Sequence, residues 1–345
     1  MAGTPLTIGV PCRDEGQDFG LFAGGLRDAI KDLQANVPVE VIVCVNGSRE
    51  GFSKDLLSIL QQTGLADFDV RVISSAEGKL NALKAIVKHR VRIGYLAFVD
   101  SDVVLAPNVL RLLWETLETD HTCMVSYGQP VPVFPEEPNI IHRLSRVHYA
   151  LRERAYRRPY FHGRTFMLRE WFFDDPNPLT DLHSSAAKRL KLERGPQVDD
   201  IAMSRMAVAR WGTEAIREVP QANVYFDPPD DLRGLYAGVL RVTVELRRLD
   251  RLYPQHAHLQ RDLFGNVWRR EGLRRFSWKV RTLHAVHRTL HASLKCVAQV
   301  HVLAVTHGVL RLDTLWIRVP GTKSFARHRH AWGNYKKRSK LTRTV

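Results

Sequence analysis

The chain has 345 residues, of which 44% are hydrophobic and 25% charged, so it is long and apolar enough for one large domain or two ordinary ones. Its formal net charge is +15, and it has four cysteines, at positions 12, 44, 123 and 296. No two of them have the CxxC spacing, which excludes a disulfide-stapled mini-protein and disfavours a structural zinc ribbon. The first residues lack the pattern of a secretory signal, so a cytoplasmic location is expected.

Charge is distributed unevenly along the chain. Residues 1–230 carry 27 Lys or Arg and 30 Asp or Glu, whereas residues 231–345 carry 24 and 6. The first part is therefore close to neutral, and the second has a net charge of +18. Such a basic region is typical of contact with an anionic membrane, a phosphate-bearing substrate or nucleic acid, and a solvated basic tail is the alternative.

Strand and helix patterns alternate through the first 130 residues. Apolar or β-branched runs predict strands at 6–10, 39–45, 70–73, 95–99 and 123–127, and helical spacing predicts helices at 21–33, 52–60, 79–88 and 108–117. This alternation predicts an α/β architecture with a mostly parallel sheet, whose ligands bind beyond the carboxyl ends of the strands. Neither GxGxxG nor GxxxxGK[ST] follows the first strand, which argues against a dinucleotide-binding unit and a P-loop.

The patterns change after about residue 134. An arginine-rich helix is expected within 143–158, a strand at 160–168 and a helix at 201–210, and the pattern is helical from residue 232 onward. His284, His287 and His291 have helical spacing, which favours a solvated helix face over a metal site. Residues 323–345 contain eight Lys or Arg and no acid, so a flexible basic tail is expected.

Two acidic pairs are candidates for chemistry. Asp100-Ser101-Asp102 follows the fourth strand, where two carboxylates one residue apart can both face Mg²⁺ or Mn²⁺. Asp199-Asp200 precedes a helix, where acids either cap the N-terminus or supply a general base for an attacking hydroxyl. Lys79 follows Gly78 at a helix start, where it either approaches a phosphate or lies on the surface.

Five motifs, taken in chain order, together resemble the family 2 glycosyltransferases, which have the GT-A fold and use nucleotide-sugar donors. They are Pro11-Cys12-Arg13-Asp14-Glu15, Asn46-Gly47-Ser48, Gly78-Lys79 with Asn81-Ala82-Leu83, Asp100-Ser101-Asp102, and Asp199-Asp200. The resemblance covers about residues 5–215. It implies a GT-A catalytic domain at 1–230, with a donor-binding half at about 1–130 and an acceptor half at about 131–230. A helical region at 231–322 and the basic tail at 323–345 would follow it.

The resemblance also implies a role for each matched residue. Asp200 is the expected catalytic base, and Asp102 with Asp100 is expected to bind Mn²⁺ or Mg²⁺. The residues expected to bind the nucleotide sugar are Pro11, Arg13, Glu15, Asn46, Lys79, Asp100, Ser101 and Arg241. His162, Gly163 and Asp199 are expected on the acceptor side, although His162 has packing as its alternative.

The implied activity is an inverting, metal-dependent transfer of a sugar from a nucleoside-diphosphate sugar, with UDP as the expected nucleotide, to an acceptor hydroxyl. The acceptor would be a sugar, a lipid-linked compound or a small molecule. Asn46 stands where the family usually has an acid, so the identity of the nucleotide is less firmly implied than the rest. No Gln-x-x-Arg-Trp motif follows Asp200, which favours a non-processive enzyme. Arg241, with Arg233 as the alternative, would take the place of that arginine.

Two alternatives to a glycosyltransferase remain open at this point. One is a sugar nucleotidyltransferase, although only one arginine and no lysine follow the first strand within 11–16. The other is a catalytically inactive GT-A-like binding protein tethered by its basic tail. An anionic membrane surface at the inner membrane face is a candidate partner of the basic region, and nucleic acid is not expected as a partner.

Overall fold

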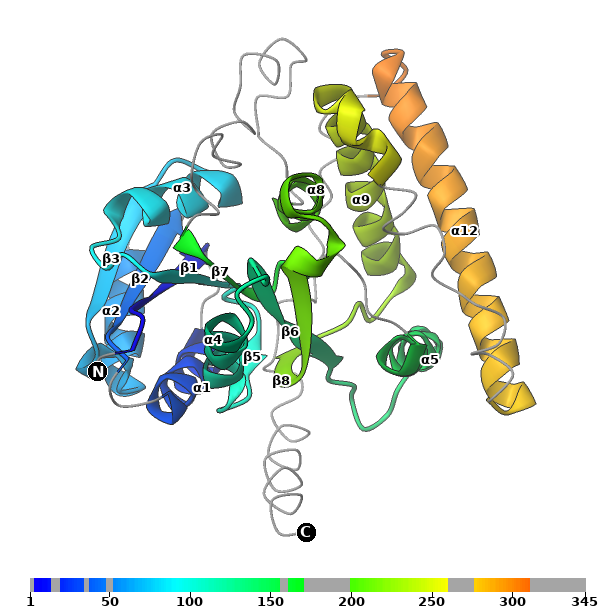
Figure 1. Cartoon of the computed structure of the whole chain (residues 1–345). Helices are drawn as coiled ribbons and strands as arrows, with labels where there is room; N and C mark the ends of the chain where they lie inside the picture. The colour runs from blue at the N-terminus through cyan, green and yellow to red at the C-terminus, as the bar shows by residue number, and fades with distance from the viewer. Residues whose placement is uncertain are drawn as a thin grey trace. The chain divides into compact units, whose positions relative to one another are not determined.

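An eight-stranded sheet organises the part of the chain that the computed structural model describes, which is residues 3–13, 19–33, 37–47, 52–155, 161–170, 199–259 and 276–310. The strands are β1 (Leu6–Cys12), β2 (Val39–Asn46), β3 (Val70–Ser75), β4 (Tyr95–Val99), β5 (Val104–Leu105), β6 (Val125–Pro132), β7 (Thr165–Leu168) and β8 (Ile216–Phe226). The longer helices are α1 (Phe19–Asp32), α2 (Phe52–Gln62), α3 (Lys79–His89), α4 (Val109–Thr119), α5 (Ile140–Ala155), α8 (Asp199–Trp211), α9 (Leu232–Leu252) and α12 (Trp278–Thr306). Figure 1 labels these elements.

The strand order is β3-β2-β1-β4-β7-β6-β8-β5. Strand β1 pairs in parallel with β2 and β4, and β2 pairs in parallel with β3. Strand β7 is antiparallel to both of its neighbours, β4 and β6, so β6 runs in the same direction as β4. The predicted α/β fold with a mostly parallel sheet is confirmed, and β7 is an antiparallel insertion that the sequence pattern did not reveal.

Helices cover both faces of the parallel strands. Helix α1 contacts α2 and α4, whereas α3 packs on β1, β2 and β3. Figure 1 shows α3 on one side of these strands and α1, α2 and α4 on the other. Every residue of β1 and β4 is buried. Two-sided burial explains why these strands are nearly continuous apolar runs rather than alternating ones.

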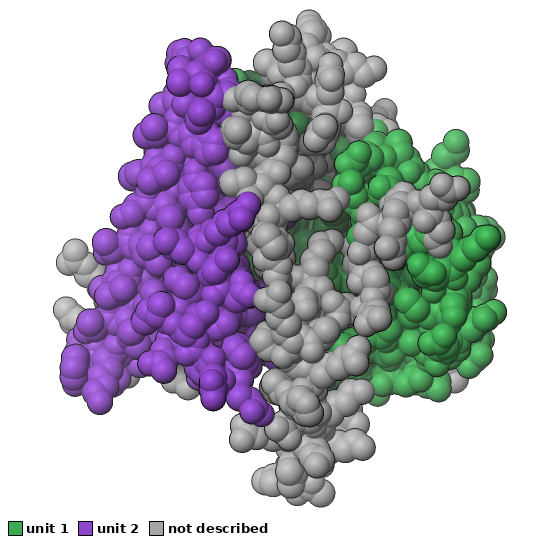
Figure 2. Space-filling view, turned by 180° about the vertical axis from the view of Figure 1, so that it is seen from behind, with its two compact units in different colours: residues 1–130, 157–224, 245–266 green, residues 131–156, 225–244, 267–345 purple. Residues whose placement is uncertain are grey.

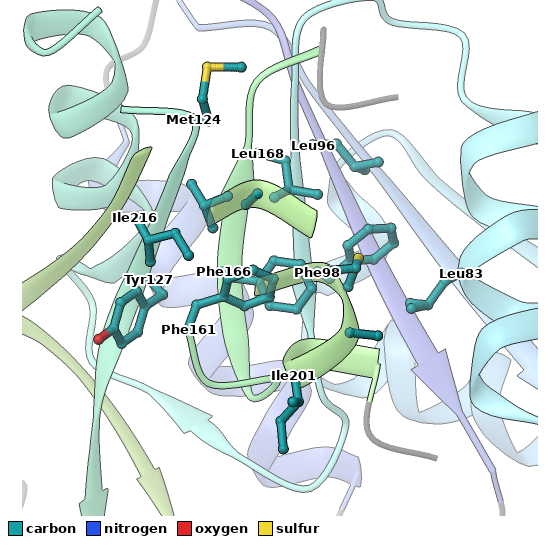
Figure 3. Close-up of a cluster of buried hydrophobic side chains, with 14 of the residues drawn as sticks. Leu83, Leu96, Phe98, Met124, Tyr127, Phe161, Phe166, Leu168, Ile201 and Ile216 are labelled. Atoms are coloured by element: carbon teal, nitrogen blue, oxygen red, sulfur yellow. The ribbon is translucent and has the colours of Figure 1, made fainter. Parts of the chain in front are cut away.

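An aromatic core lies where β4 meets β7 (Figure 3). The rings of Phe98 and Phe166 have centroids 5.5 Å apart, and those of Phe161 and Phe166 are 4.6 Å apart. Leu83 of α3 and Ile201 of α8 complete the same buried cluster. The packing therefore fixes both the residues that precede β7 and the first turn of α8.

The predicted strand at 160–168 is shorter in the structure. Only Thr165–Leu168 forms β7, while Phe161–Arg164 is a loop. In this loop the backbone N–H of Phe161 donates to Ser204 Oγ at 3.1 Å, and that of Gly163 donates to Asp200 Oδ2 at 2.9 Å. Both donors therefore bond to α8 rather than to a neighbouring strand.

The chain forms two compact units whose residues alternate along the sequence (Figure 2). Unit 1 comprises residues 1–130, 157–224 and 245–266, and unit 2 comprises residues 131–156, 225–244 and 267–345. The sequence predicts a different division, into a catalytic domain at 1–230, a helical region at 231–322 and a basic tail at 323–345. This functional division stays a prediction. The basic tail 323–345 lies outside the described residues.

Unit 2 is built from α5, the first part of α9, and α12. Val239, Leu240 and Val244 of α9 form a small core with Ala298 and Val302 of α12. Helix α5 also contacts α12. No helix among the described residues has both the length and the apolar character that crossing a membrane requires.

The expectation that the α12 histidines form a solvated face is wrong for two of them. His284 and His287 are only 2% and 7% exposed. The ring of His287 stacks on that of His148 of α5, with centroids 4.8 Å apart. Burial, helped by His291 and His284, lowers the pKa of His287 to about 4. The helical spacing of the histidines gave no sign that α5 covers this side of α12.

A buried carboxylate, Glu40 on β2, joins three parts of unit 1. Its Oε1 accepts from Thr7 Oγ1 at 2.7 Å and from the backbone N–H of Arg92 at 2.8 Å. Its Oε2 accepts from Arg71 Nη2 at 2.6 Å. Burial favours the neutral form, but these hydrogen bonds and one from the N–H of Val91 outweigh it and lower the pKa of Glu40 below its usual 4.5.

We expect Glu40→Gln to lower the free energy of unfolding by about 2 kcal/mol at pH 7, because it removes charge-assisted hydrogen bonds from a buried site. A carboxyl whose pKa is lower when folded contributes fully above its unfolded pKa and loses that contribution as pH falls through the folded value. The gap between wild type and variant should therefore shrink below pH 4.5. Urea titrations from pH 7 to pH 3 measure this difference in unfolding free energy between wild type and variant. Glu214→Gln, which breaks an exposed pair with Arg217, is the control, with an expected cost of at most about 1 kcal/mol. A gap that stays constant down to pH 3 would contradict the prediction.

Candidate active site

The carboxyl ends of the first parallel strands are joined by short polar contacts. Ser101 Oγ, after β4, donates to the carbonyl of Pro11 on β1 at 3.1 Å. The side-chain amide of Asn46, at the end of β2, donates to the carbonyl of Cys12 at 3.0 Å. Ser101 and Asn46 are 6% and 5% exposed. Three of the residues expected to bind the nucleotide, Pro11, Asn46 and Ser101, therefore lie together at one edge of the sheet, where they stabilise its backbone.

The loop between β3 and α3 meets the same edge. Glu77 Oε1 lies 2.8 Å from Arg13 Nη1, directly after β1. Gly47, after β2, has a φ of +64°, and a Cβ at this position would lie 2.8 Å from Cβ of Glu77. Only glycine fits both this backbone conformation and this close approach. The turn after β2 and the loop before α3 are thus packed against each other.

Lys79 connects this loop to the acidic residues after β4. Its Nζ lies 2.7 Å from Asp100 Oδ1, and both side chains are partly exposed. Lys79 begins α3 directly after Gly78, whose φ is +120°. A helix N-terminus and a lysine side chain both favour an anion, and the phosphate-binding role of Lys79 stays a prediction.

The residues after β4 have the donor chemistry for a hard divalent cation. Asp100 and Asp102 supply carboxylate oxygens, which Mg²⁺ and Mn²⁺ prefer. Within the described ranges, no group of three or more His, Cys, Asp or Glu that could hold a metal is found. Mg²⁺ commonly uses one or two protein carboxylates together with water and substrate phosphates, so the pair fits such an ion.

Asp200 lies in the first turn of α8, and both of its carboxylate oxygens are oriented by backbone N–H groups. Oδ2 accepts from Gly163 at 2.9 Å, and Oδ1 accepts from Ile201 at 2.9 Å. A Cβ on Gly163 would lie 3.1 Å from Oδ2, closer than nine in ten such contacts. Gly163 therefore allows the loop backbone to approach and hold this carboxylate.

One loop, Phe161–Arg164, connects the two acidic centres of unit 1. At one end, the carbonyl of Arg164 accepts from the backbone N–H of Asp100 at 2.8 Å. In the middle, Gly163 holds Asp200. Ser204, one turn after Asp200, accepts from the N–H of Phe161 and donates to the carbonyl of Asp200 at 2.6 Å. Residues that are 100 positions apart in the chain are thereby linked by hydrogen bonds through one loop.

Some predicted site residues are not placed by this network. Glu15 lies outside the described residues, and of Asp199 only the backbone, which starts α8, is described. Arg241 lies on α9 within unit 2. His162 Nδ1 lies 3.1 Å from Arg164 Nη1, inside the connecting loop. The nucleotide-binding or acceptor roles of these residues stay predictions.

Two residues of the site, Glu77 and Ser204, were not among the residues predicted to act. Glu77 immediately precedes the Gly78-Lys79 motif, and Ser204 lies four residues after Asp200, on the same helix face. The i+4 spacing was a usable signal for Ser204. The loop contact through Phe161 was not, because it joins segments 43 residues apart.

The mostly parallel sheet flanked by helices matches the GT-A class of α/β fold. The model of glycosyl transferase family 2 matches residues 7–175. Through this segment, which contains four of the five motifs, the chain belongs to glycosyl transferase family 2, and it is a glycosyltransferase. The predicted family and enzyme class are confirmed.

Solved structures of glycosyltransferases are similar to the chain at low sequence identity. A mannosyltransferase from Pyrobaculum calidifontis in complex with GDP-Man and Mn²⁺ is 14% identical, with a TM-score of 0.50 over 90% of this chain and 88% of that one. Glucosyl-3-phosphoglycerate synthase of M. tuberculosis is 20% identical, with a TM-score of 0.46 over 73% of this chain and 81% of that one. No curated protein sequence matches the chain.

Proposed function

We propose that the chain transfers a sugar from a nucleoside-diphosphate sugar to an acceptor hydroxyl, with inversion at the anomeric carbon, and that Asp200 is the base. The observation that carries this proposal is the loop Phe161–Arg164, which bonds to Asp100 on one side and to Asp200 on the other. The loop thus links Asp100, whose carboxylate is suited to bind a metal–diphosphate, to Asp200, whose carboxylate is suited to accept a proton. That is the arrangement a direct displacement needs.

The acceptor step follows from the position of Asp200. Backbone N–H groups orient both carboxylate oxygens of Asp200, and an ionised carboxylate is a hydrogen-bond acceptor only. Such a carboxylate can accept the proton of an acceptor hydroxyl while that oxygen attacks the anomeric carbon. The bond from this carbon to the diphosphate oxygen breaks as the new bond forms, so nucleoside diphosphate leaves and the configuration inverts.

The leaving group needs positive charge. A divalent cation held by Asp102 and Asp100 would neutralise the negative charge that develops on the diphosphate. Lys79 already contacts Asp100 at 2.7 Å, so its ammonium lies beside the same carboxylate and is suited to bind a phosphate oxygen. Arg13, Glu15, Asn46 and Arg241 remain proposed donor contacts, and His162, Gly163 and Asp199 remain proposed for the acceptor side.

The donor and acceptor classes are also proposals. UDP is the proposed nucleotide, and Mn²⁺ or Mg²⁺ the proposed metal. One structure of the M. tuberculosis synthase contains UDP-Glc and Mn²⁺, and the mannosyltransferase structure contains GDP-Man and Mn²⁺. A non-processive transfer to a sugar, lipid-linked or small-molecule acceptor fits the absence of a Gln-x-x-Arg-Trp motif from the sequence. The proposed location of the enzyme is the cytoplasm, at the inner face of the membrane.

The test is binding of UDP-, GDP- and dTDP-sugars with and without Mn²⁺, measured by calorimetry on wild type and on Asp102→Asn. We expect one nucleotide to bind in a Mn²⁺-dependent way, and Asp102→Asn to weaken that binding at least about tenfold, because it removes one carboxylate from the cation. Release of free nucleoside diphosphate from the bound donor reports slow hydrolysis and should fall in the same variant.

Asp55→Asn, an exposed change on α2, is the matched control and should bind the donor like wild type. If folded wild type binds none of the donors, the nucleotide-sugar proposal fails. If Asp102→Asn binds the donor with unchanged Mn²⁺ dependence, the metal assignment fails while the choice of donor stands.

A further inference from the structure

Helix α12 of unit 2 is strongly basic. Its 29 residues contain four Lys or Arg and no Asp or Glu. Arg281, Arg288 and Lys295 are exposed and spaced seven residues apart. Seven residues are close to two helical turns, so these cations form one stripe along the helix.

Apolar side chains lie beside this stripe and face solvent. Trp278, Val297 and Val300 are 66%, 56% and 66% exposed, and Val286 and Leu303 are about half exposed. Helical geometry places them roughly opposite Ala298 and Val302, which are buried in the core of unit 2. We refer to the five exposed apolar residues and the three-residue basic stripe as the α12 face.

The apolar surface continues from α12 onto α9. Leu232, Arg233 and Tyr236 of α9 line an apolar groove with Leu294 and Val297 of α12. Leu232 is itself 50% exposed, and Arg233 places a cation at the groove. All these residues belong to unit 2. An apolar surface on two helices, bordered by cations, is more than the scattered exposed side chains of an ordinary surface.

We propose that the α12 face is a docking surface for an anionic lipid membrane. A helix that lies in the membrane interface buries an apolar face among the lipid headgroups while its Lys and Arg side chains contact lipid phosphates. The α12 face has both parts, has no acid to repel phosphate, and belongs to a chain of net charge +15. The inference rests on unit 2 alone and is independent of the donor chemistry.

The test is co-sedimentation of the full-length chain with vesicles of phosphatidylcholine, alone or mixed with phosphatidylglycerol, at low and high salt. We expect binding to the anionic vesicles that weakens with salt. A variant with Arg281, Arg288 and Lys295 all changed to Ser should bind about a hundredfold more weakly, because each cation contributes about 1 kcal/mol. Val297→Glu combined with Val300→Glu should also lose binding.

The matched control changes the exposed Lys31, Lys54 and Lys88 of unit 1 to Ser, which removes the same charge elsewhere. Circular dichroism and thermal unfolding establish that each variant is folded. The proposal is overturned if wild type does not bind anionic vesicles at low salt, or if the control loses as much binding as the stripe variant. It is also overturned if deletion of residues 323–345 abolishes vesicle binding while the stripe variant and the Val297→Glu, Val300→Glu variant still bind. A third contrary result would be a wild type that binds no vesicles but forms a dimer, if Val297→Glu with Val300→Glu dissociates that dimer.

Discussion

Asp200→Asn is expected to reduce kcat for sugar transfer by about 10²–10⁴ while donor binding stays near the wild-type value. The variant removes the carboxylate that takes the acceptor proton. Initial rates with the donor identified by calorimetry, together with donor affinity, separate the loss of the chemical step from a loss of binding. Asp200→Glu should also be impaired, because the extra methylene moves the carboxylate away from the N–H of Gly163.

The stability of Asp200→Asn needs its own control. Both carboxylate oxygens accept backbone hydrogen bonds, whereas an asparagine offers one oxygen and one N–H₂ group. One N–H, of Gly163 or of Ile201, would then face another donor, at a cost of about 1–3 kcal/mol. Thermal unfolding measures this cost, and Ser204→Ala, which removes a neighbouring loop contact and keeps Asp200, provides the comparison. A kcat of Asp200→Asn equal to that of wild type would disprove the assignment of the base.

The residues after each parallel strand were predictable because local patterns determine them. An apolar run followed by Arg13, by Asn46-Gly47 or by Asp100 identifies the end of a strand, and parallel strands bring their carboxyl ends to one edge. The contacts Arg13–Glu77 and Lys79–Asp100 agree with that reasoning. The motifs thus identified residues that lie together at one edge of the sheet, and the role of these residues in donor binding stays a prediction.

The loop that connects the two acids was not predictable in the same way. Residues 160–168 were expected to form one strand, and only the pairing of β7 with β4 and β6 places Gly163 against Asp200. The burial of His284 and His287 likewise depends on α5. These features arise from contacts between distant segments, which hydrophobic periodicity does not encode.

Arg169 is a further residue whose structural role was not predictable from the sequence pattern. It directly follows β7, and its side chain is buried, being 4% exposed. Its guanidinium donates to the carbonyls of Cys123 at 2.7 Å and Asp120 at 3.0 Å, and also to the carbonyl of Leu117. Leu117 lies in the last turn of α4, where carbonyls have no partner within the helix. Arg169 therefore satisfies a buried helix end and places a cation at its negative pole.

We expect Arg169→Met to destabilise the chain by about 3–5 kcal/mol, because it leaves several buried carbonyls without donors while filling most of the volume. The melting temperature should fall by on the order of 10 °C. Arg169→Lys keeps the charge but loses the planar set of donors, and it should recover only part of this stability. Differential scanning calorimetry measures all three proteins.

Arg217→Met is the matched control. Arg217 also bonds to Asp120, through its carboxylate, but this pair is about one third exposed and should contribute at most about 1 kcal/mol. If Arg169→Met costs no more than Arg217→Met, the buried carbonyls do not depend on Arg169. If it costs several kcal/mol more, the buried end of α4 depends on Arg169. Because Arg169 adjoins β7, and β7 continues from the loop that holds Asp200, we also expect the variant to affect the site. Donor binding and kcat of Arg169→Met, measured below its melting temperature, should then show a larger loss in kcat than in binding.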